Sequence, residues 1–428
     1  MDTQVIPRTA PASAEEKERV TGTQLVLHKN GLVYRLPQSL STSVNRTFIK
    51  NYAQSQEYKE SRTVVFDLNT GSRYIDPERC ALIFTVDVDF AGSLDATLGW
   101  GSEGQTAAAL IKHLLIKAKN GVELDRVDEV NLYSFVRRKF EGSNEEVLFI
   151  DSNAGSQQTA NEVQFNAAAN APKTYVIPLH HLSGLFRPTV KGMKMPASLL
   201  SGARVELTLE KVGRAFTRQA GTVNVGTTYT ISDPQIIMMS HELNDMTQRT
   251  LNEVSATDGL EYTYPRTFVN LSTSSTNRTN IQVKKAVSQA TRVWAISCED
   301  ADKENIQAPS FDSSQVIGFD KYQYRVGALF YPQQKVESLP EAQYVSQDAF
   351  GSKKSVIGVE DYATTDRVLA ASLELDAALN LSGIPINNSS TLEVTLEYTG
   401  VSSAHTHYVS MDYIAVSRSF LTNVSVKV

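Results

Sequence analysis

The chain has little of several features that mark common protein classes. Its 428 residues include only two cysteines and two tryptophans, and its formal net charge is −6. A mildly acidic balance does not mark the whole protein as a nucleic-acid binder. No apolar run approaches the length of a membrane span, and no N-terminal apolar stretch resembles a signal peptide. The remaining composition, 41% apolar and 21% charged, is that of a globular protein long enough for two or three domains.

The two cysteines, Cys80 and Cys298, each lie in or beside an apolar run that is typical of a β-strand. Free cysteine behaves as a small hydrophobic residue and is often buried. We therefore expect two reduced, buried thiols, because nothing in the sequence supports a disulfide between them.

An internal repeat is the most informative feature that is present. Residues 205–210 read Val-Glu-Leu-Thr-Leu-Glu and residues 392–397 read Leu-Glu-Val-Thr-Leu-Glu, each after a Leu-Ser-Gly sequence. A turn-rich gap and a second β-like run follow each of them, at 229–240 and at 408–420. Alternation of apolar and polar residues predicts strands with one buried face. A repeat of antiparallel strands without an enzyme motif predicts a structural protein built from two similar β-domains.

The same alternation predicts further strands. In residues 81–90, Phe84, Val86 and Val88 face one way, while Asp87 and Asp89 face the other. The remaining candidates are 63–68, 114–119, 122–127, 174–179, 267–271, 281–287, 291–297, 322–331 and 368–375. Many short antiparallel strands joined by long loops predict sandwiches or jelly rolls. Regularly alternating helices are lacking, which argues against a parallel α/β sheet.

Some connecting segments allow specific predictions. Asn120-Gly121 separates two strand candidates, and this dipeptide favours a hairpin with a type I′ turn. Residues 141–173 and 299–318 are rich in polar residues, so we expect surface loops, of which the first is long enough to be functional. Residues 242–253 have a helical pattern and are expected to link the two halves of the chain.

One glycine-rich segment fits a nucleotide-binding motif, but the predicted strand before it is in the wrong position. Residues 99–104 read Gly-Trp-Gly-Ser-Glu-Gly, which fits Gly-x-Gly-x-x-Gly. A dinucleotide site needs a strand that runs straight into the first glycine, but residues 91–98 separate the predicted strand from Gly99. Glu103 would also place a carboxylate where phosphate should bind. We therefore expect no nucleotide site.

The histidines do not predict a metal site. His405 and His407 lie on one face of a predicted strand, but zinc would need a third and a fourth ligand from elsewhere. His241-Glu242 begins like the zinc motif His-Glu-x-x-His, but Asp245 stands where the second histidine belongs. The other histidines show no partner spacing; they are His28, His113, His180 and His181.

A group of carboxylates resembles a calcium loop only in part. Asp300, Asp302 and Glu304 have suitable spacing, but Asn305 and Phe311 stand where an EF-hand requires Gly and Glu. An EF-hand is excluded, and looser calcium binding stays open. Since Gly-x-Ser-x-Gly and P-loop motifs are also missing, we expect no catalytic, cofactor-binding or metal-binding residues, and no enzyme activity.

Four stretches carry a likeness to a known family through their order along the chain. They are 114–135, with its Asn-Gly turn; 176–200, with Pro-Leu, Leu-Phe and Leu-Leu pairs; 231–262; and 381–398, which precedes the last strand. In this order they resemble the double jelly-roll major capsid proteins of icosahedral DNA viruses, a group that includes virophages, Polinton-like viruses, nucleocytoplasmic viruses and tailless bacterial viruses. The likeness covers residues 60–428. His180-His181 departs from it, because the larger viruses tend to have aromatic residues there.

The resemblance implies an all-β fold of two consecutive eight-stranded jelly rolls with few short helices. Residues 1–45 would form an N-terminal arm, 46–247 the first roll with its surface loop 141–173, and 248–428 the second roll. Three chains would form a homotrimer whose six barrels make a pseudo-hexameric capsomer, the unit that tiles an icosahedral shell.

The resemblance also implies partners and a location. The partners would be other copies of the chain, penton and minor capsid proteins, and an internal membrane. The near-neutral arm argues against direct neutralisation of a genome, so no sequence-specific contact with nucleic acid is expected. The protein would lie in the capsid of the virion and would assemble inside the host cell.

An alternative from another class is a β-sandwich protein that binds or cleaves carbohydrate. Jelly-roll strands and polar loops fit this interpretation, and a glycosidase needs only two carboxylates. Against it, Trp100 and Trp294 are the only tryptophans, whereas sugar platforms usually need several aromatic residues.

Overall fold

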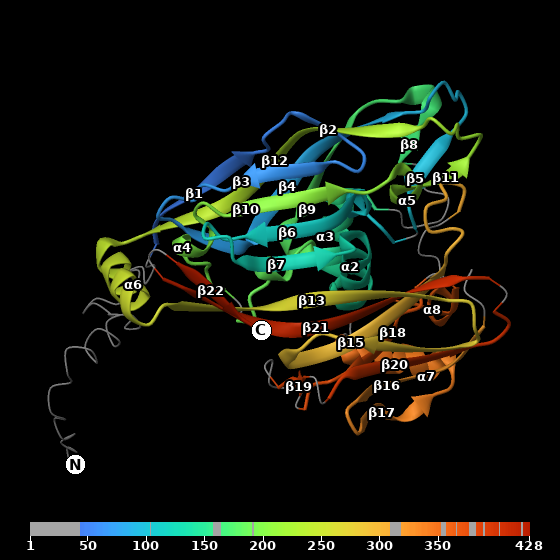
Figure 1. Ribbon diagram of the computed structural model, residues 1–428. Helices are drawn as coiled ribbons and strands as arrows, with labels where there is room; N and C mark the ends of the chain where they lie inside the picture. Colours follow the sequence, from blue (N-terminus) through green and yellow to red (C-terminus); the bar gives the residue numbers. More distant parts are fainter. Residues whose placement is uncertain are drawn as a thin grey trace, which may run out of the picture.

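The computed structural model describes residues 43–428, apart from 103, 157–163, 191, 309–317, 352–356, 365, 376–381, 388–389, 402 and 421–422. Nearly all of the expected arm, residues 1–45, lies outside this range. The described chain forms two β-rich halves side by side; the first is blue to green and the second yellow to red (Figure 1). None of its helices combines the length and the apolar character of a membrane span.

The first half contains two main antiparallel sheets, each built on a row of four strands. One has the order β1 (Ser43–Tyr52), β12 (Thr228–Leu243), β4 (Tyr74–Asp89) and β9 (Lys173–Pro178). The other has the order β3 (Thr63–Asp67), β10 (Arg204–Leu209), β6 (Ile111–Lys117) and β7 (Glu123–Asp128). A short strand, β2 (Glu57–Lys59), also pairs with β12.

The second half repeats this arrangement. One sheet has the order β13 (Leu260–Ser274), β21 (His405–Ser419), β15 (Val287–Glu299) and β18 (Leu369–Ser372). The other has the order β14 (Arg278–Val283), β20 (Leu392–Tyr398), β16 (Phe319–Val326) and β17 (Leu329–Val336). Two short strands extend the first of these sheets: β19 (Ile384–Ile386) pairs with β15, and β22 (Val424–Lys427) pairs with β21.

The strand order is identical in the two halves. When the eight main strands of each half are counted along the chain, one sheet runs 1-8-3-6 and the other runs 2-7-4-5. This is the order of a jelly roll, in which two Greek keys enclose one core. The predicted double jelly roll is thus confirmed, and we call the halves the first and the second roll. The repeated runs form the seventh strands, β10 and β20, and the runs that follow them form the eighth strands, β12 and β21.

Alternation determines which side chains enter each core. In β20, Leu392, Val394 and Leu396 are fully buried, while the residues between them are only partly covered. In β4, Asp87 and Asp89 are exposed between buried apolar residues, as the sequence predicts. These two carboxylates therefore belong to the outer face of a sheet.

The predicted hairpin at Asn120-Gly121 exists, but its turn is of another type. A type I′ turn needs positive φ at both central residues, and only Gly121 has it, at +83°. The Gly121 amide donates to the Ala118 carbonyl and the Ala118 amide to the Val122 carbonyl, both at 2.8 Å. This is the longer hairpin in which a glycine in the left-handed region follows a type I turn. The side-chain amide of Asn120 donates to the Val424 carbonyl at 2.8 Å, joining the hairpin to the C-terminal strand.

The segment 141–173 is only partly the surface loop that we expected. It contains α3 (Asn144–Ala154), the short strand β8 (Phe165–Asn166) and a 3₁₀ turn (Ala167–Ala169). β8 pairs with β5 (Thr97–Trp100), which pairs with β11 (Phe216–Ala220), so three connections of the first roll build a third sheet. The Trp100 ring anchors this sheet, since its centroid lies 5.9 Å from that of Phe165 and 5.5 Å from that of Phe216.

Some helices were missed by the sequence analysis. α2 (Val130–Val136) continues into a π-helical turn, η2 (Arg137–Glu141), and every residue of α2 is buried. α7 (Leu339–Ala349) and α8 (Val359–Thr364) lie between β17 and β18, and 322–331 forms parts of two strands rather than one. The linking helix is α6 (Asp245–Thr257), which starts three residues later than expected and is capped by the Asn244 side chain. The remaining short helical turns are η1 (Ala107–Leu110), η4 (Leu179–His181), η5 (Gly184–Phe186), α4 (Ala197–Leu200) and α5 (Val212–Ala215).

The two rolls share parts of their cores. Leu132, Phe135 and Phe140 belong to the first roll by sequence, yet they pack in the core of the second. Tyr262 and Tyr264 of β13 pack in the core of the first. The backbones also approach closely, because a Cβ atom at Gly184 would overlap the Pro265 carbonyl and one at Gly213 would overlap the Glu304 carbonyl.

Candidate functional site

Buried charges line the junction between the rolls. The carboxylate of Glu141, at the end of η2, is paired with Arg137, Arg187 and Arg292, and Arg292 is also paired with Asp412 of β21. Burial alone would raise the pKa of Glu141, but the three arginines hold it well below its usual range. The carboxylate is therefore charged and held by residues from both rolls.

A second ion pair centres on Arg214 of α5. Its side chain is 2% exposed, and its guanidinium lies 2.5 Å from Glu129 and 3.4 Å from Glu210. The same guanidinium donates to the Tyr408 hydroxyl of β21 at 3.1 Å. Burial opposes the charge, but Glu129, Tyr408 and Glu210 raise the pKa of Arg214 above its usual value.

A third ion pair joins β7 to β13. Arg266 lies 3.4 Å from Asp125, which is completely buried, and 2.5 Å from Glu123. Burial raises the pKa of Asp125, while Arg266, the Ser183 hydroxyl and two backbone amides act in the opposite direction. Buried ion pairs contribute little net stability, but removal of one partner leaves an uncompensated charge. The pairs of Glu141 with Arg292 and of Arg266 with Asp125 join the two rolls, so they penalise any shift of one roll against the other.

The residues that the sequence offered as ligands are held by other contacts. His405 and His407 are both 2% exposed. The His407 Nδ1 lies 2.7 Å from the Ser297 hydroxyl, and the ring stacks on Tyr398, whereas the His405 Nδ1 lies 2.8 Å from the Ser403 carbonyl. Burial lowers the pKa of His407 to about 4. Both histidines thus have structural partners within the second roll.

Two of the three carboxylates of the calcium-like loop, Asp300 and Glu304, are also paired. Asp300 accepts from the Thr406 hydroxyl at 2.7 Å, and Glu304 lies 2.7 Å from the Lys211 ammonium. Phe311 and Glu103 are outside the described residues. Gly99 lies in β5, and the chain continues through η1 into another strand, so no long helix follows the glycine-rich run.

The two cysteines are free and buried, as expected. Burial raises the pKa of both thiols, that of Cys298 to about 12. Both are therefore neutral at ordinary pH.

One cluster was missed by the sequence analysis, which found no partner for His180 or His181. The Nε2 atoms of these residues, in η4, lie 3.3 and 3.2 Å from the same Glu146 oxygen, in the first turn of α3. Within the part of the chain that the structure describes, this is the only group of three or more His, Cys, Asp and Glu residues whose ligand atoms could surround one ion. A cavity of 530 Å³ adjoins it.

A row of apolar side chains is exposed on β1, the edge strand of its sheet. Val44, Phe48 and Tyr52 are 71%, 63% and 66% exposed, and we call them the β1 stripe. Tyr52 lies in line with the half-buried Ile83 and Val176 across the outer face of the same sheet. Large apolar side chains exposed on an edge strand are typical of a site of association.

Comparison with known protein families and with curated proteins finds no match to the sequence. Solved structures do match. A chain of the PBCV-1 virus capsid aligns with a TM-score of 0.62 and 12% identity over 92% of this chain and 98% of that chain. The Faustovirus major capsid protein aligns with a TM-score of 0.61 and 8% identity over 95% and 94%. The mavirus major capsid protein aligns with a TM-score of 0.54 and 10% identity over 100% and 97%.

The chain has the double jelly-roll fold of viral major capsid proteins. The alignments extend over nearly the whole of both chains, so both rolls take part. At these low identities the likeness is one of fold, and individual side chains cannot be carried over from those structures.

Proposed function

We propose that the chain is the major capsid protein of an icosahedral virus, and that three copies assemble into a pseudo-hexameric capsomer of the virion shell. The observation that carries this proposal is the presence of two rolls of identical strand order, locked side by side. Three such chains place six similar barrels around a three-fold axis, so that a closed trimer acquires a nearly hexagonal outline. Units of this outline fill a flat facet.

The buried junction supports this role. A facet can be tiled only if the two barrels of each chain keep a fixed spacing. The ion pairs of Glu141 and Arg266 and the hydrogen bond from Arg214 to Tyr408 join residues of both rolls in buried positions, and each would be broken by a small shift. The shared cores act in the same direction, since the side chains of α2 and β13 each fill the neighbouring roll.

The β1 stripe supports contact between copies. An exposed edge strand with apolar side chains invites association, and soluble proteins usually cover such an edge. We propose that a second copy of the chain covers it within the capsomer, because obligate interfaces between subunits bury large apolar areas. Arg46 and Lys50 alternate with the stripe, so its partner surface should be apolar with acidic residues at the margin.

Further partners and the domain division complete the proposal. Neighbouring capsomers, penton proteins and minor capsid proteins are the partners that a facet requires, and an internal membrane is a candidate contact of residues 1–45. The two domains would be 46–247 and 248–428, with a boundary inside α6. The role needs no catalysis, so we propose no enzyme activity.

The test is the mass of the purified full-length chain in solution, measured by light scattering and combined with negative-stain imaging. We expect a stable particle of three times 47.1 kDa with a hexagonal outline. A compact monomer that never assembles would contradict the proposal. If such a monomer also bound glycans on an array, the carbohydrate-binding alternative would replace it.

A further inference from the structure

Two neighbouring imidazoles and one carboxylate converge beside α3. His180 and His181 end the short helical turn that follows β9, and Glu146 lies in the first turn of α3. Both Nε2 atoms approach the same carboxylate oxygen of Glu146, at 3.3 and 3.2 Å. Two histidine nitrogens and one carboxylate oxygen form the donor set that open zinc sites use.

The separations fit one ion held by all three groups. Zn²⁺ binds histidine nitrogen and carboxylate oxygen at about 2.0–2.2 Å, so two ligands of a tetrahedral ion lie roughly 3.3–3.5 Å apart. Of the two Nε2–Oε1 distances, 3.3 Å is at the short end of this range and 3.2 Å is just below it, and all three ligand atoms lie within 4.8 Å of one another. They are longer than the usual N–H···O hydrogen bond of about 2.9–3.0 Å.

The second nitrogen of each ring is also open to the tautomer that a metal ligand needs. An imidazole that binds an ion through Nε2 carries its proton on Nδ1. The Nδ1 atoms of both histidines are buried without a hydrogen-bond partner, so no second contact fixes which ring nitrogen carries the proton.

The adjoining cavity provides both charge and space. Its volume is 530 Å³, and the charged residues that line it are four carboxylates and two guanidiniums; they are Glu78, Glu141, Glu145, Glu146, Arg137 and Arg187. The sum of these charges is −2, which favours a divalent cation. The open side leaves room for a fourth ligand, such as water.

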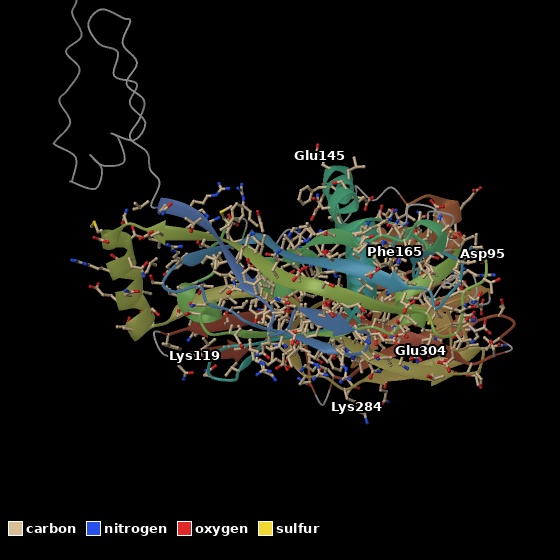
Figure 2. All side chains as sticks on the ribbon, turned by 90° about the horizontal axis from the view of Figure 1, so that it is seen from above. Asp95, Lys119, Glu145, Phe165, Lys284 and Glu304 are labelled. Carbon is tan, nitrogen blue, oxygen red and sulfur yellow. The ribbon has the colours of Figure 1, made fainter. Side chains whose placement is uncertain are left out.

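We propose that Glu146, His180 and His181 bind a divalent transition-metal ion, with Zn²⁺ as the best fit, and that this ion fastens α3 to the end of β9. α3 projects from the surface of the first roll, where Glu145 marks its tip (Figure 2). Its Leu148 and Phe149 side chains are 63% and 57% exposed. The ion would hold these apolar side chains in a fixed position on the surface of the first roll. This proposal does not depend on the capsid role.

The experiment uses the full-length chain after dialysis against a chelator. Zn²⁺ is added and measured by titration calorimetry and by elemental analysis, and Co²⁺ is added in parallel because its visible absorption reports tetrahedral coordination. We expect one Zn²⁺ per chain. Binding and the Co²⁺ absorption should be lost in Glu146→Gln and in His180→Ala, and each variant is checked for folding by thermal melting.

The matched control is His113→Ala, since His113 is a half-exposed histidine with one carboxylate partner, Asp128, at 3.2 Å. It should bind Zn²⁺ like the unaltered chain. Absence of stoichiometric binding, or equal binding by folded Glu146→Gln, would overturn the site. Amide hydrogen exchange in α3 should slow when Zn²⁺ is added; unchanged exchange with bound Zn²⁺ would overturn the fastening of the helix.

Discussion

The guanidinium of Arg214 in the first roll lies 3.1 Å from the hydroxyl of Tyr408 in the second. Two buried carboxylates, Glu129 and Glu210, hold the guanidinium in place from its own roll. Arg214 therefore forms ion pairs within its own barrel and a hydrogen bond to the next barrel. It exemplifies a junction in which polar groups determine the spacing of two apolar cores.

Replacement of Arg214 tests how strongly this junction depends on charge balance. Arg214→Ala leaves two buried carboxylates without a cation, so we expect a loss of about 3–5 kcal/mol in the free energy of unfolding. Arg126→Ala is the control, because Arg126 pairs with Asp128 at the surface and should cost at most about 1 kcal/mol. Urea denaturation of both variants measures the difference, and equal losses would contradict a special role for the buried pair.

The pH dependence of Glu141 gives a second prediction. The arginines lower its pKa in the folded chain, so its charge stabilises the fold fully above its unfolded pKa of about 4.3. That contribution disappears as the pH falls through the lower folded pKa. Glu141→Gln should therefore be less stable than the unaltered chain at pH 7 and at pH 5, by a similar amount.

The deficit of Glu141→Gln should shrink only at pH 3 and below. Denaturation midpoints at the three pH values measure it. Glu261→Gln serves as the control, since Glu261 pairs with Arg418 at an exposed position and should show little deficit at any pH. A Glu141→Gln deficit that vanished already at pH 5 would mean that the carboxylate does not have the lowered pKa.

The β1 stripe predicts an effect on assembly without an effect on folding. Phe48→Glu and Tyr52→Glu place charges on exposed positions, so the thermal unfolding of the single chain should change little. The charges should weaken association, and light scattering should show a shift from trimer to monomer. Val225→Glu, at another fully exposed aliphatic residue, is the control and should leave the trimer intact. If all three variants stay trimeric, the stripe is not an interface within the trimer.

Gly184 tests the close approach of the two rolls. Alanine at this position would place a methyl group on the Pro265 carbonyl, so the backbones must move apart. We expect Gly184→Ala to lower the melting temperature more than Gly192→Ala. At Gly192 the methyl group would meet open space, and only the backbone strain of a positive φ remains, about 1–2 kcal/mol. Equal shifts would show that the rolls can separate without cost.

The sequence predicts those parts of the fold that depend on local alternation. Strands such as β4, β10 and β20 have a clear period of two, because one face is buried and the other meets solvent. β1 was missed because its exposed face carries Val44, Phe48 and Tyr52, so that polarity does not separate the two faces. α2 was missed because all its residues are buried, which leaves no amphipathic period.

The candidate sites were harder to predict than the strands. Glu146 and His181 are 35 residues apart, and only the return of the chain through β8 and β9 brings them together. The ion pairs of the junction join residues that are far apart in the chain; Glu141 and Arg292, for example, are separated by 151 positions. A spacing rule detects ligands on one helix or one turn, but it cannot detect groups whose proximity depends on the topology of two barrels.

The placement of Leu132, Phe135 and Phe140 in the second core has a consequence for synthesis on the ribosome. When the first roll has left the ribosome, these side chains still lack the β-strands that cover them, because those strands are encoded more than a hundred residues later. A nascent chain would thus expose the apolar side chains of α2 for much of its translation, and exposed apolar surface promotes aggregation. Because β20 and β21 are made last, the second barrel and its cover over these side chains are completed only when synthesis ends, so truncated products should be captured by holding chaperones or degraded.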